Sequence, residues 1–302
     1  MVSNRLCQPS VNKSDFLVGD EGMTPPEKLE YLEDDGLLTP EIRPWTVEKY
    51  RVVGIFNKIF STGMKDKWGC RTYIDLFAGA GRGKLKGTNK ILAGSPLLAL
   101  GVPDQYDKYI FCEKQKKSLD ALKDRVNRVK ESHPNVNVTF FDGDCNEKID
   151  EILSAIPKMQ SVLSFCFMDP YNIGIHFGTV RRLSQYRMDF LILLAIRMDA
   201  ARNIKHHKRI GLCLGDDNWM EEWEQAKREG VKFPNFFAEK YASQMETLGY
   251  EDTARETMHE MRSDDKNLPL YHLAFFSKHP LGYKFWEQAR KYGIDQQSLP
   301  FK

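Results

Sequence analysis

The sequence predicts a Rossmann-like α/β fold, in which a mostly parallel sheet is covered by helices on both faces. Two observations support this prediction. Short runs rich in apolar, β-branched and aromatic residues alternate with segments of helical periodicity, and a glycine-rich loop directly follows the first run. Near-continuous apolar strands are typical of parallel sheets that are buried on both sides. The runs predicted as strands cover residues 72–77, 108–112, 136–141, 162–168 and 189–196.

The helical segments carry apolar residues at spacings of three or four. We expect one helix from Thr46, as its N-cap, to about Gly63, and a second over residues 114–130. Residues 252–261 and 270–276 are expected to add two strands, and a closing helix should follow them. These two strands would form an antiparallel hairpin at the edge of the sheet, which makes a seven-stranded fold.

Length and composition indicate a large folded core. A chain of 302 residues with 41% hydrophobic content can bury such a core, so disorder of the whole chain is excluded. Polar residues 1–44 are expected to form an N-terminal extension to which we assign no chemistry. Residues 45–196 and 251–302 form the predicted core, and residues 197–250 are predicted to be a helical insertion or lid. A net charge of +2 does not by itself indicate a partner.

The cysteines and the apolar runs indicate the compartment. The six cysteines are scattered without a C-x-x-C pair, and we expect them to be reduced and mostly buried. No apolar stretch follows a basic start, and no run of about 18 uncharged apolar residues occurs, so neither a signal peptide nor a membrane span is predicted. We therefore expect a cytoplasmic protein.

The glycine loop is the first candidate binding feature. Asp75 lies at the end of the first strand, which continues through Phe77 into a loop with Gly79, Gly81 and Gly83. Ligands of open α/β sheets bind at the carboxyl ends of strands, and glycine lets the backbone approach them closely. Asp75 can accept a hydrogen bond from a cationic amine. The alternative interpretation is a tight turn that packs a helix on the sheet.

Acidic residues follow the next two strands as well. Glu113, after the second strand, can bind both hydroxyls of a ribose, and Asp144 with Cys145, after the third, would lie beside an adenine. The chain has no G-x-x-x-x-G-K-[ST] motif, and carboxylates would repel a pyrophosphate but attract a sulfonium and an ammonium. This favours S-adenosylmethionine as the cofactor. For Glu113 or Asp144 alone, a helix N-cap role explains the residue equally well.

The fourth strand ends in Asp169-Pro170-Tyr171, at the same edge of the sheet. Methyl transfer to an amine requires alignment of the nucleophile and handling of its proton. An exocyclic amine could donate to the Asp169 carboxylate and to the Pro170 carbonyl, while Tyr171 stacks on the target ring. These three residues are the predicted catalytic residues. The alternative is that Asp-Pro only ends a strand.

These motifs resemble those of known families. The segment from Asp75 to Gly81, together with Asp169-Pro170-Tyr171, resembles the cofactor loop and the D-P-P-Y signature of adenine or cytosine amino-methyltransferases, with one proline fewer. Together with the Gly-Ser-Pro segment at 94–96, it also resembles a bacterial ribosomal RNA adenine-N6 methyltransferase family. Over roughly residues 44–290 the chain is similar to the three-Cys-motif partner proteins. The resemblance rests on Pro44, Trp45, Lys49, Gly143, Asp144, the Gly215-Asp216-Asp217 run and residues 277–282.

Two functions of different classes are open at this point. The first is an S-adenosylmethionine-dependent methyltransferase that acts on an amino group of a nucleic-acid base, DNA or RNA. The second, implied by the resemblance, is a partner protein without transferase activity that docks on a three-cysteine, iron–sulfur, radical-type protein. No metal site is expected, because His206 and His207 are adjacent and have no further ligands at familiar spacing. The basic residues expected either to contact phosphates or to form a solvated helix face are Arg197, Arg202, Lys205, Lys208 and Arg209.

Overall fold

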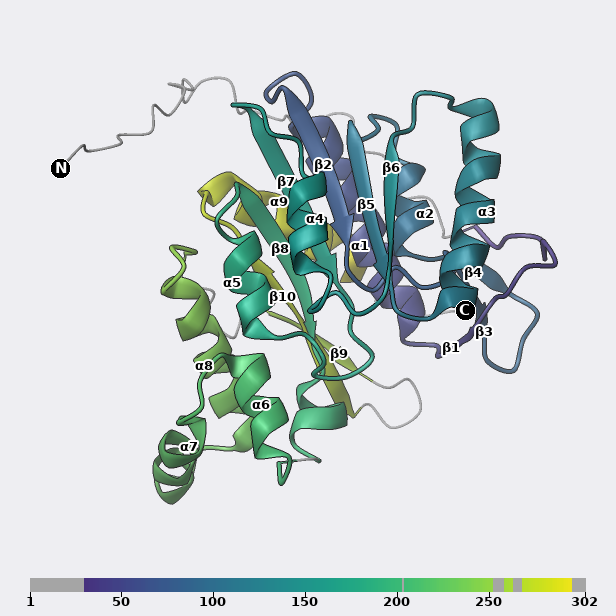
Figure 1. Ribbon diagram of the computed structural model, residues 1–302. Helices are drawn as coiled ribbons and strands as arrows, with labels where there is room; N and C mark the ends of the chain where they lie inside the picture. The colour runs from purple at the N-terminus through teal and green to yellow at the C-terminus, as the bar shows by residue number, and fades with distance from the viewer. Residues whose placement is uncertain (1–29, 203, 252–257, 263–267, 295–302) are drawn as a thin grey trace.

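A seven-stranded sheet forms the centre of the molecule (Figure 1). The computed structural model describes residues 30–202, 204–251, 258–262 and 268–294. The strand order is β6-β5-β2-β7-β8-β10-β9, and only β10 runs against its two neighbours. This is the predicted Rossmann-like, mostly parallel α/β fold with an antiparallel hairpin at one edge. In spatial order the strands are Val138–Asp142, Lys108–Glu113, Cys70–Asp75, Val162–Met168, Met188–Leu194, Pro269–Phe276 and His259–Arg262.

The strand sequences divide the core into two layers. Successive side chains of a strand point to opposite faces. In β5, Tyr109 and Phe111 pack into one buried cluster, whereas Ile110 and Cys112 pack into the other. Because both faces need apolar side chains, β2, β7 and β8 are buried along almost their whole length. The near-continuous apolar runs of the sequence are the direct result.

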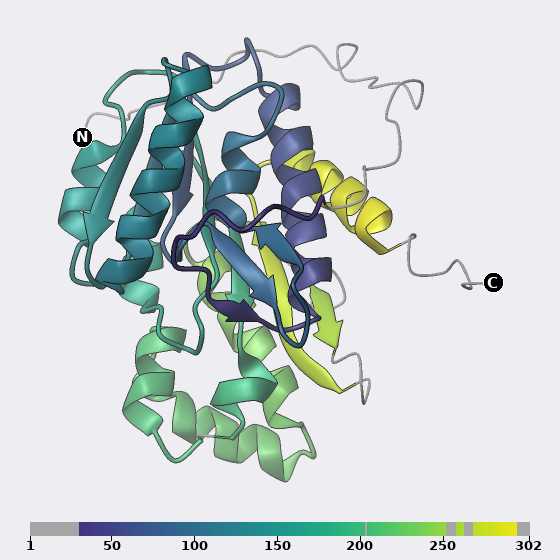
Figure 2. The same cartoon turned by 90° about the vertical axis from the view of Figure 1, so that its right-hand side faces the viewer.

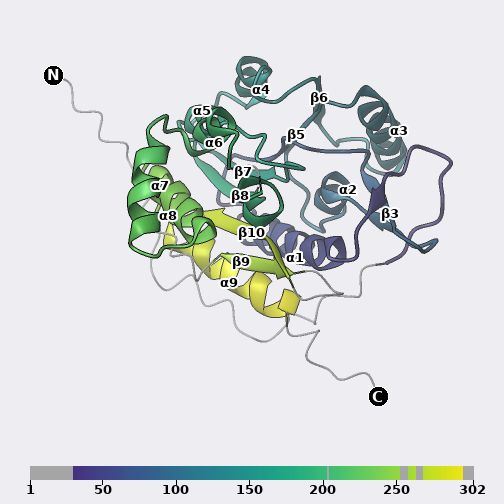
Figure 3. The same cartoon turned by 90° about the horizontal axis from the view of Figure 1, so that it is seen from below.

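Helices cover both faces of the sheet. Figure 3 shows α1 and α9 on one side and α4 and α5 on the other. The cluster that contains Tyr109 and Phe111 lies under α1, α2, α3 and α9. The cluster that contains Ile110 and Cys112 lies under α4, α5, α6, α7 and α8. The helices are α1 Thr46–Gly63, α2 Ser95–Leu100, α3 Lys116–Ser132, α4 Ile149–Ala155, α5 Phe177–Leu183, α6 His207–Leu214, α7 Trp219–Arg228, α8 Phe233–Glu246 and α9 Pro280–Ile294.

A second, three-stranded sheet was not predicted. It has the order β1-β3-β4, with β1 Glu41–Ile42, β3 Arg82–Leu85 and β4 Ile91–Ala93. The glycine loop leads directly into β3, and β4 leads through Gly94 into α2. Figure 2 shows the N-terminal segment that contains β1 crossing over the β3–β4 hairpin. Short strands of this kind carry little periodicity, so the sequence pattern did not reveal them.

Several predicted boundaries need correction. Thr46 is the first residue of α1 and Trp45 is its N-cap, without a side-chain capping bond, so the prediction of Thr46 as the cap is wrong by one residue. The first strand begins at Cys70 and ends at Asp75, so Phe77 lies in the following turn. Of the strand predicted over 252–261, residues 252–257 lie outside the described part of the chain.

The segment predicted as an insertion contains a π-helical turn, Ile196–Ala200, followed by α6, α7 and α8. Phe237 and Tyr241 of α8 are fully buried in the cluster under the sheet. The described cysteines are five free thiols, all buried, as expected. None of the helices in the described residues is both long and apolar enough to cross a bilayer.

Candidate functional site

Asp75 lies at the carboxyl end of β2 and is fully buried. Its carboxylate accepts hydrogen bonds from the Phe77 amide at 3.2 Å, from the Tyr73 hydroxyl at 3.3 Å and from the Ser95 hydroxyl. Burial raises the pKa of Asp75 to about 7, and the nearby Asp169 carboxylate adds to the rise, against the lowering by these hydrogen bonds. Asp75 is therefore a buried acid that titrates near neutral pH.

The two central glycines of the loop differ in their surroundings. Both need positive φ, +61° at Gly79 and +80° at Gly81, a conformation that favours glycine. A Cβ added at Gly79 would meet no atom within 4 Å, whereas one added at Gly81 would lie 2.8 Å from Leu122 Cδ1. Gly79 thus faces open space, where a ligand can approach the backbone, and Gly81 packs against α3.

Glu113 joins the glycine loop to the start of α3. One carboxylate oxygen accepts the Gly79 amide at 2.8 Å, and the other accepts the Gln115 amide at 2.7 Å. Gln115 is the N-cap of α3 and has no side-chain capping bond, so the N-cap alternative is wrong for Glu113, whereas its contact with a ribose stays a prediction. Glu113 as a residue is half-buried.

Asp144 and Cys145 follow β6 as predicted, but the sequence missed their neighbour Asn146. Asp144 accepts the Asn146 amide at 2.9 Å and pairs with Lys114 at 3.0 Å. The Asn146 side chain also donates to the Gly174 carbonyl at 2.8 Å, which ties the loop after β6 to the loop after β7. Cys145 is buried in the core, and its burial raises the pKa of the thiol, so it is a packing contact rather than a reactive group.

Asp169 follows β7 and forms an ion pair with Lys49 of α1. Both side chains are largely buried, with 17% of Asp169 and 9% of Lys49 exposed. The ammonium contacts only Oδ2 of Asp169, and within the described residues Oδ1 has no hydrogen-bond donor. The Asp169 carboxylate is thereby held in one orientation, and no described residue donates to its second oxygen.

The other two predicted catalytic residues are placed differently. Pro170 is buried, whereas Tyr171 is 96% exposed. The segment after Tyr171 is anchored by Asp199 in the π-helical turn, which accepts the Ile173 amide at 3.0 Å and pairs with Arg209 at 3.0 Å. A fully exposed ring at the end of a fixed segment can stack on a planar ligand from solution.

The predicted phosphate-contacting residues lie between β8 and α6 and within α6. Arg209 is used internally by Asp199, and Arg197 is half-buried. The exposed members are Arg202, Lys205 and Lys208, together with His206 and His207. In the described part of the chain, no three potential metal ligands gather at one place.

The structure reveals polar residues at the site to which the sequence analysis gave no role. These are Lys49, Ser95 and Asn146, which contact Asp169, Asp75 and Asp144 respectively. Lys49 and Ser95 had sequence signals, because both belong to the segments that carry the family resemblances, whereas Asn146 had none. A cavity of about 420 Å³ adjoins Asn146, and it is lined among others by Thr179, Arg182 and Gly211.

Comparisons with known proteins give structural likenesses only. No family model matches the chain, and no curated protein matches it. It is similar to a Legionella pneumophila protein described as DUF519, at 12% identity and a TM-score of 0.47, over 80% of this chain and 91% of that one. It is also similar to Trm1 from Pyrococcus horikoshii in complex with S-adenosyl-L-methionine, at 7% identity and a TM-score of 0.43, over 86% of this chain and 64% of that one. It is similar as well to M. jannaschii TYW2 in complex with AdoMet, at 10% identity and a TM-score of 0.39, over 85% of this chain and 90% of that one. At these scores the likenesses support no statement about activity.

Proposed function

We propose that this protein is an S-adenosylmethionine-dependent methyltransferase that acts on an amino group of a nucleic-acid base. One observation carries the proposal. Glu113 and Asp75 end the neighbouring strands β5 and β2, and Asp169 follows β7, the next strand in the sheet. Three carboxylates thus share one edge with the open face of Gly79. Ligands of sheets of this kind bind at that edge.

The residues around the glycine loop suit a cationic nucleoside. Open space beside Gly79 leaves room for a ligand against the backbone. In this proposal Glu113 accepts hydrogen bonds from the ribose hydroxyls, and Asp75 balances the positive charge of the amino-acid part. Asp144 and Cys145 lie on the adenine side. Bound S-adenosylmethionine would supply an activated methyl group, and it carries no phosphate for the carboxylates to repel.

Asp169 provides the acceptor side of the reaction. Its free oxygen, Oδ1, can accept a hydrogen bond from the target amine while Lys49 holds Oδ2. The hydrogen bond directs the nitrogen lone pair and strengthens as positive charge develops on the attacking nitrogen. The Pro170 carbonyl would accept the second amine proton, and the exposed Tyr171 ring would stack on the base.

A nucleic-acid acceptor is favoured by the exposed basic residues after β8. Arg202, Lys205 and Lys208 are exposed in the same segment that anchors the residues after Tyr171 through Asp199. Lysine and arginine side chains position a nucleic acid by contacting its phosphates. In this proposal, Arg197 and Arg209 support that surface from its partly buried side.

Two measurements test the proposal. Calorimetric titration with S-adenosylmethionine should give saturable one-site binding, with adenosine triphosphate as the negative control. Mass spectrometry of nucleosides from cells with and without the protein should then reveal a methylated base that depends on it. If S-adenosylmethionine does not bind to the purified protein, the proposal is wrong.

The Lys49–Asp169 ion pair favours a second candidate function. An ammonium already neutralises the carboxylate that an amine would need, and one proline of the amino-methyltransferase signature is missing. Both features fit a protein that keeps the methyltransferase fold and acts by docking on a three-cysteine protein. Cofactor binding without any methylated nucleoside, together with a stable complex between the two purified proteins, would favour this function over the first.

A further inference from the structure

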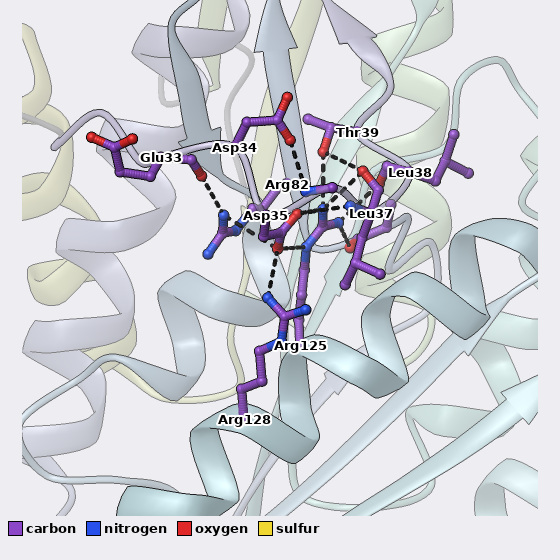
Figure 4. Close-up of polar contacts among 11 residues, drawn as sticks. Glu33, Asp34, Asp35, Leu37, Leu38, Thr39, Arg82, Arg125 and Arg128 are labelled. Atoms are coloured by element: carbon purple, nitrogen blue, oxygen red, sulfur yellow. Dashed lines mark hydrogen bonds and ion pairs between the residues drawn. The ribbon is translucent and has the colours of Figure 1, made fainter.

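The N-terminal arm, residues 30–42, is tied to the body of the protein beside the glycine loop. The Leu32 amide donates to the Ile91 carbonyl at 2.8 Å, and β1 pairs with β3 in parallel. Between these contacts, arm residues converge on arginines of β3 and α3, as Figure 4 shows. The arm, to which the sequence analysis assigned no chemistry, therefore lies against the segment that follows the loop.

Arg125 of α3 is the centre of this cluster, and only 2% of its side chain is exposed. Its Nε and Nη2 donate to the Asp35 carboxylate at 2.8 and 2.7 Å. Its Nη1 donates to the Leu38 carbonyl at 2.9 Å and to the Ala80 carbonyl at 2.6 Å. One buried guanidinium thus bonds simultaneously to the arm and to the peptide between the two loop glycines.

The arrangement depends on the charge of Asp35. A buried guanidinium is costly unless an anion and acceptors satisfy its donors, and the planar fork of arginine matches a carboxylate bidentately. The hydrogen bond from Arg125 lowers the pKa of Asp35 to about 2, so the carboxylate is ionised at neutral pH. Arg82 and Arg128 approach the same carboxylate at 3.2 and 3.7 Å.

The peptide at Ala80 needs outside support because of its neighbours. Gly79 and Gly81 both adopt positive φ and have no side chain to restrict them. Glu113 holds the Gly79 amide from one side, and Arg125 holds the Ala80 carbonyl from the other. Without the second contact, the open face of Gly79 would lose a fixed orientation.

We infer that Arg125 is a positioning residue for the glycine loop and that the arm, through Asp35, is part of the cofactor site. The inference rests on the proposed function, since it takes S-adenosylmethionine as the ligand of the loop. With 2% of its side chain exposed, Arg125 itself would not touch the ligand. It fixes the geometry of the glycine-loop backbone that would contact the ligand, and the arm fixes the position of Arg125.

Full-length variants test this with two readouts, hydrogen–deuterium exchange of residues 76–83 and calorimetric titration with S-adenosylmethionine. Asp35→Asn preserves the shape of the side chain but removes its charge. Hydrogen–deuterium exchange of the loop should become about tenfold faster, and the affinity for S-adenosylmethionine should fall by about tenfold. Arg128→Ala is the matched control, because Arg128 approaches the same carboxylate but, among the described residues, forms no hydrogen bond or ion pair with the loop. It should stay within about twofold of the wild type.

A purely structural role predicts a different result. Ile156→Ala, which opens a cavity at the end of α4 under the opposite face of the sheet, lowers stability without touching the arm. Equal loop exchange in Asp35→Asn and Ile156→Ala, or a wild-type rate in Asp35→Asn, would overturn the inference. If the wild type does not bind S-adenosylmethionine, the proposed function fails instead, and the exchange rates still decide the role of Arg125.

Discussion

The proposed cofactor half and the proposed acceptor half of the site are built in different ways. In the cofactor half, Asp75 and Glu113 bond to amides two residues further along the chain, and Glu113 also holds the loop at Gly79. In the acceptor half, Asp169 is oriented by Lys49, which is 120 residues away in the sequence. Tyr171 has no such support and is exposed.

The difference has a chemical consequence. Backbone amides fixed by short-range contacts form a rigid cradle, which suits a cofactor that must bind in the same way each time. The ion pair with Lys49 occupies one oxygen of Asp169 and leaves the other for an arriving amine. Substitutions in the cofactor half should therefore change binding, whereas those in the acceptor half should change turnover.

The largest effect is expected at Asp169. Asp169→Asn should reduce methyl transfer by about 100-fold or more, because in the proposed reaction the carboxylate acts chiefly in the transition state. Affinity for S-adenosylmethionine should stay within a few fold, as measured by calorimetry alongside single-turnover kinetics on the verified acceptor. Asp142→Asn, at the end of the edge strand β6, is the control and should turn over normally. Full turnover in Asp169→Asn would refute the amine-orienting role.

The next effect concerns Glu113. Glu113→Ala removes the acceptor for the Gly79 and Gln115 amides and should weaken S-adenosylmethionine binding by about 1.5–3 kcal/mol. Glu147→Ala, an exposed carboxylate in the loop after β6, should leave the dissociation constant unchanged. A dissociation constant unaltered by Glu113→Ala would remove the ribose assignment and leave Glu113 only its bonds to the Gly79 and Gln115 amides.

Valine substitutions at the two loop glycines should have different effects, one mainly on cofactor binding and the other mainly on stability. Gly81→Val collides with Leu122, so its free energy of unfolding should fall by about 1–3 kcal/mol more than that of Gly79→Val. Gly79→Val fills the open face and should abolish cofactor binding in a folded protein. Urea denaturation and titration of both variants measure this. Equal losses of stability would mean that both glycines only shape the turn.

The smallest effect is a pH dependence set by Asp75. With its pKa raised to about 7, Asp75 is mostly protonated at pH 6 in the free protein. A bound cation favours the ionised form, so affinity for S-adenosylmethionine should rise about tenfold from pH 6 to pH 8 as Asp75 loses its proton. Titrations in two buffers of different ionisation enthalpy measure the released proton. Asp75→Asn should remove this part of the pH dependence, and its persistence would exclude Asp75 as the source.

Much of the fold could be read from the sequence because its signals are local. The near-continuous apolar run over 108–112 predicts a strand wherever that strand pairs, and helical spacing predicts α1 and α3 to within two residues at each end. The glycines and the acidic residues after the strands are local signals too. They meet at one edge because parallel strands end at the same side of a sheet.

These sequence patterns do not predict contacts between residues that are far apart in the chain. No periodicity tells which polar side chain of α1 will meet the fourth strand of the core, so the pairing of Lys49 with Asp169 came only from the tertiary structure. The bond between Arg125 and Asp35 spans 90 residues, and both look like ordinary surface charges in the sequence. A buried ion pair depends on where two backbones come together, and packing of the whole core determines that.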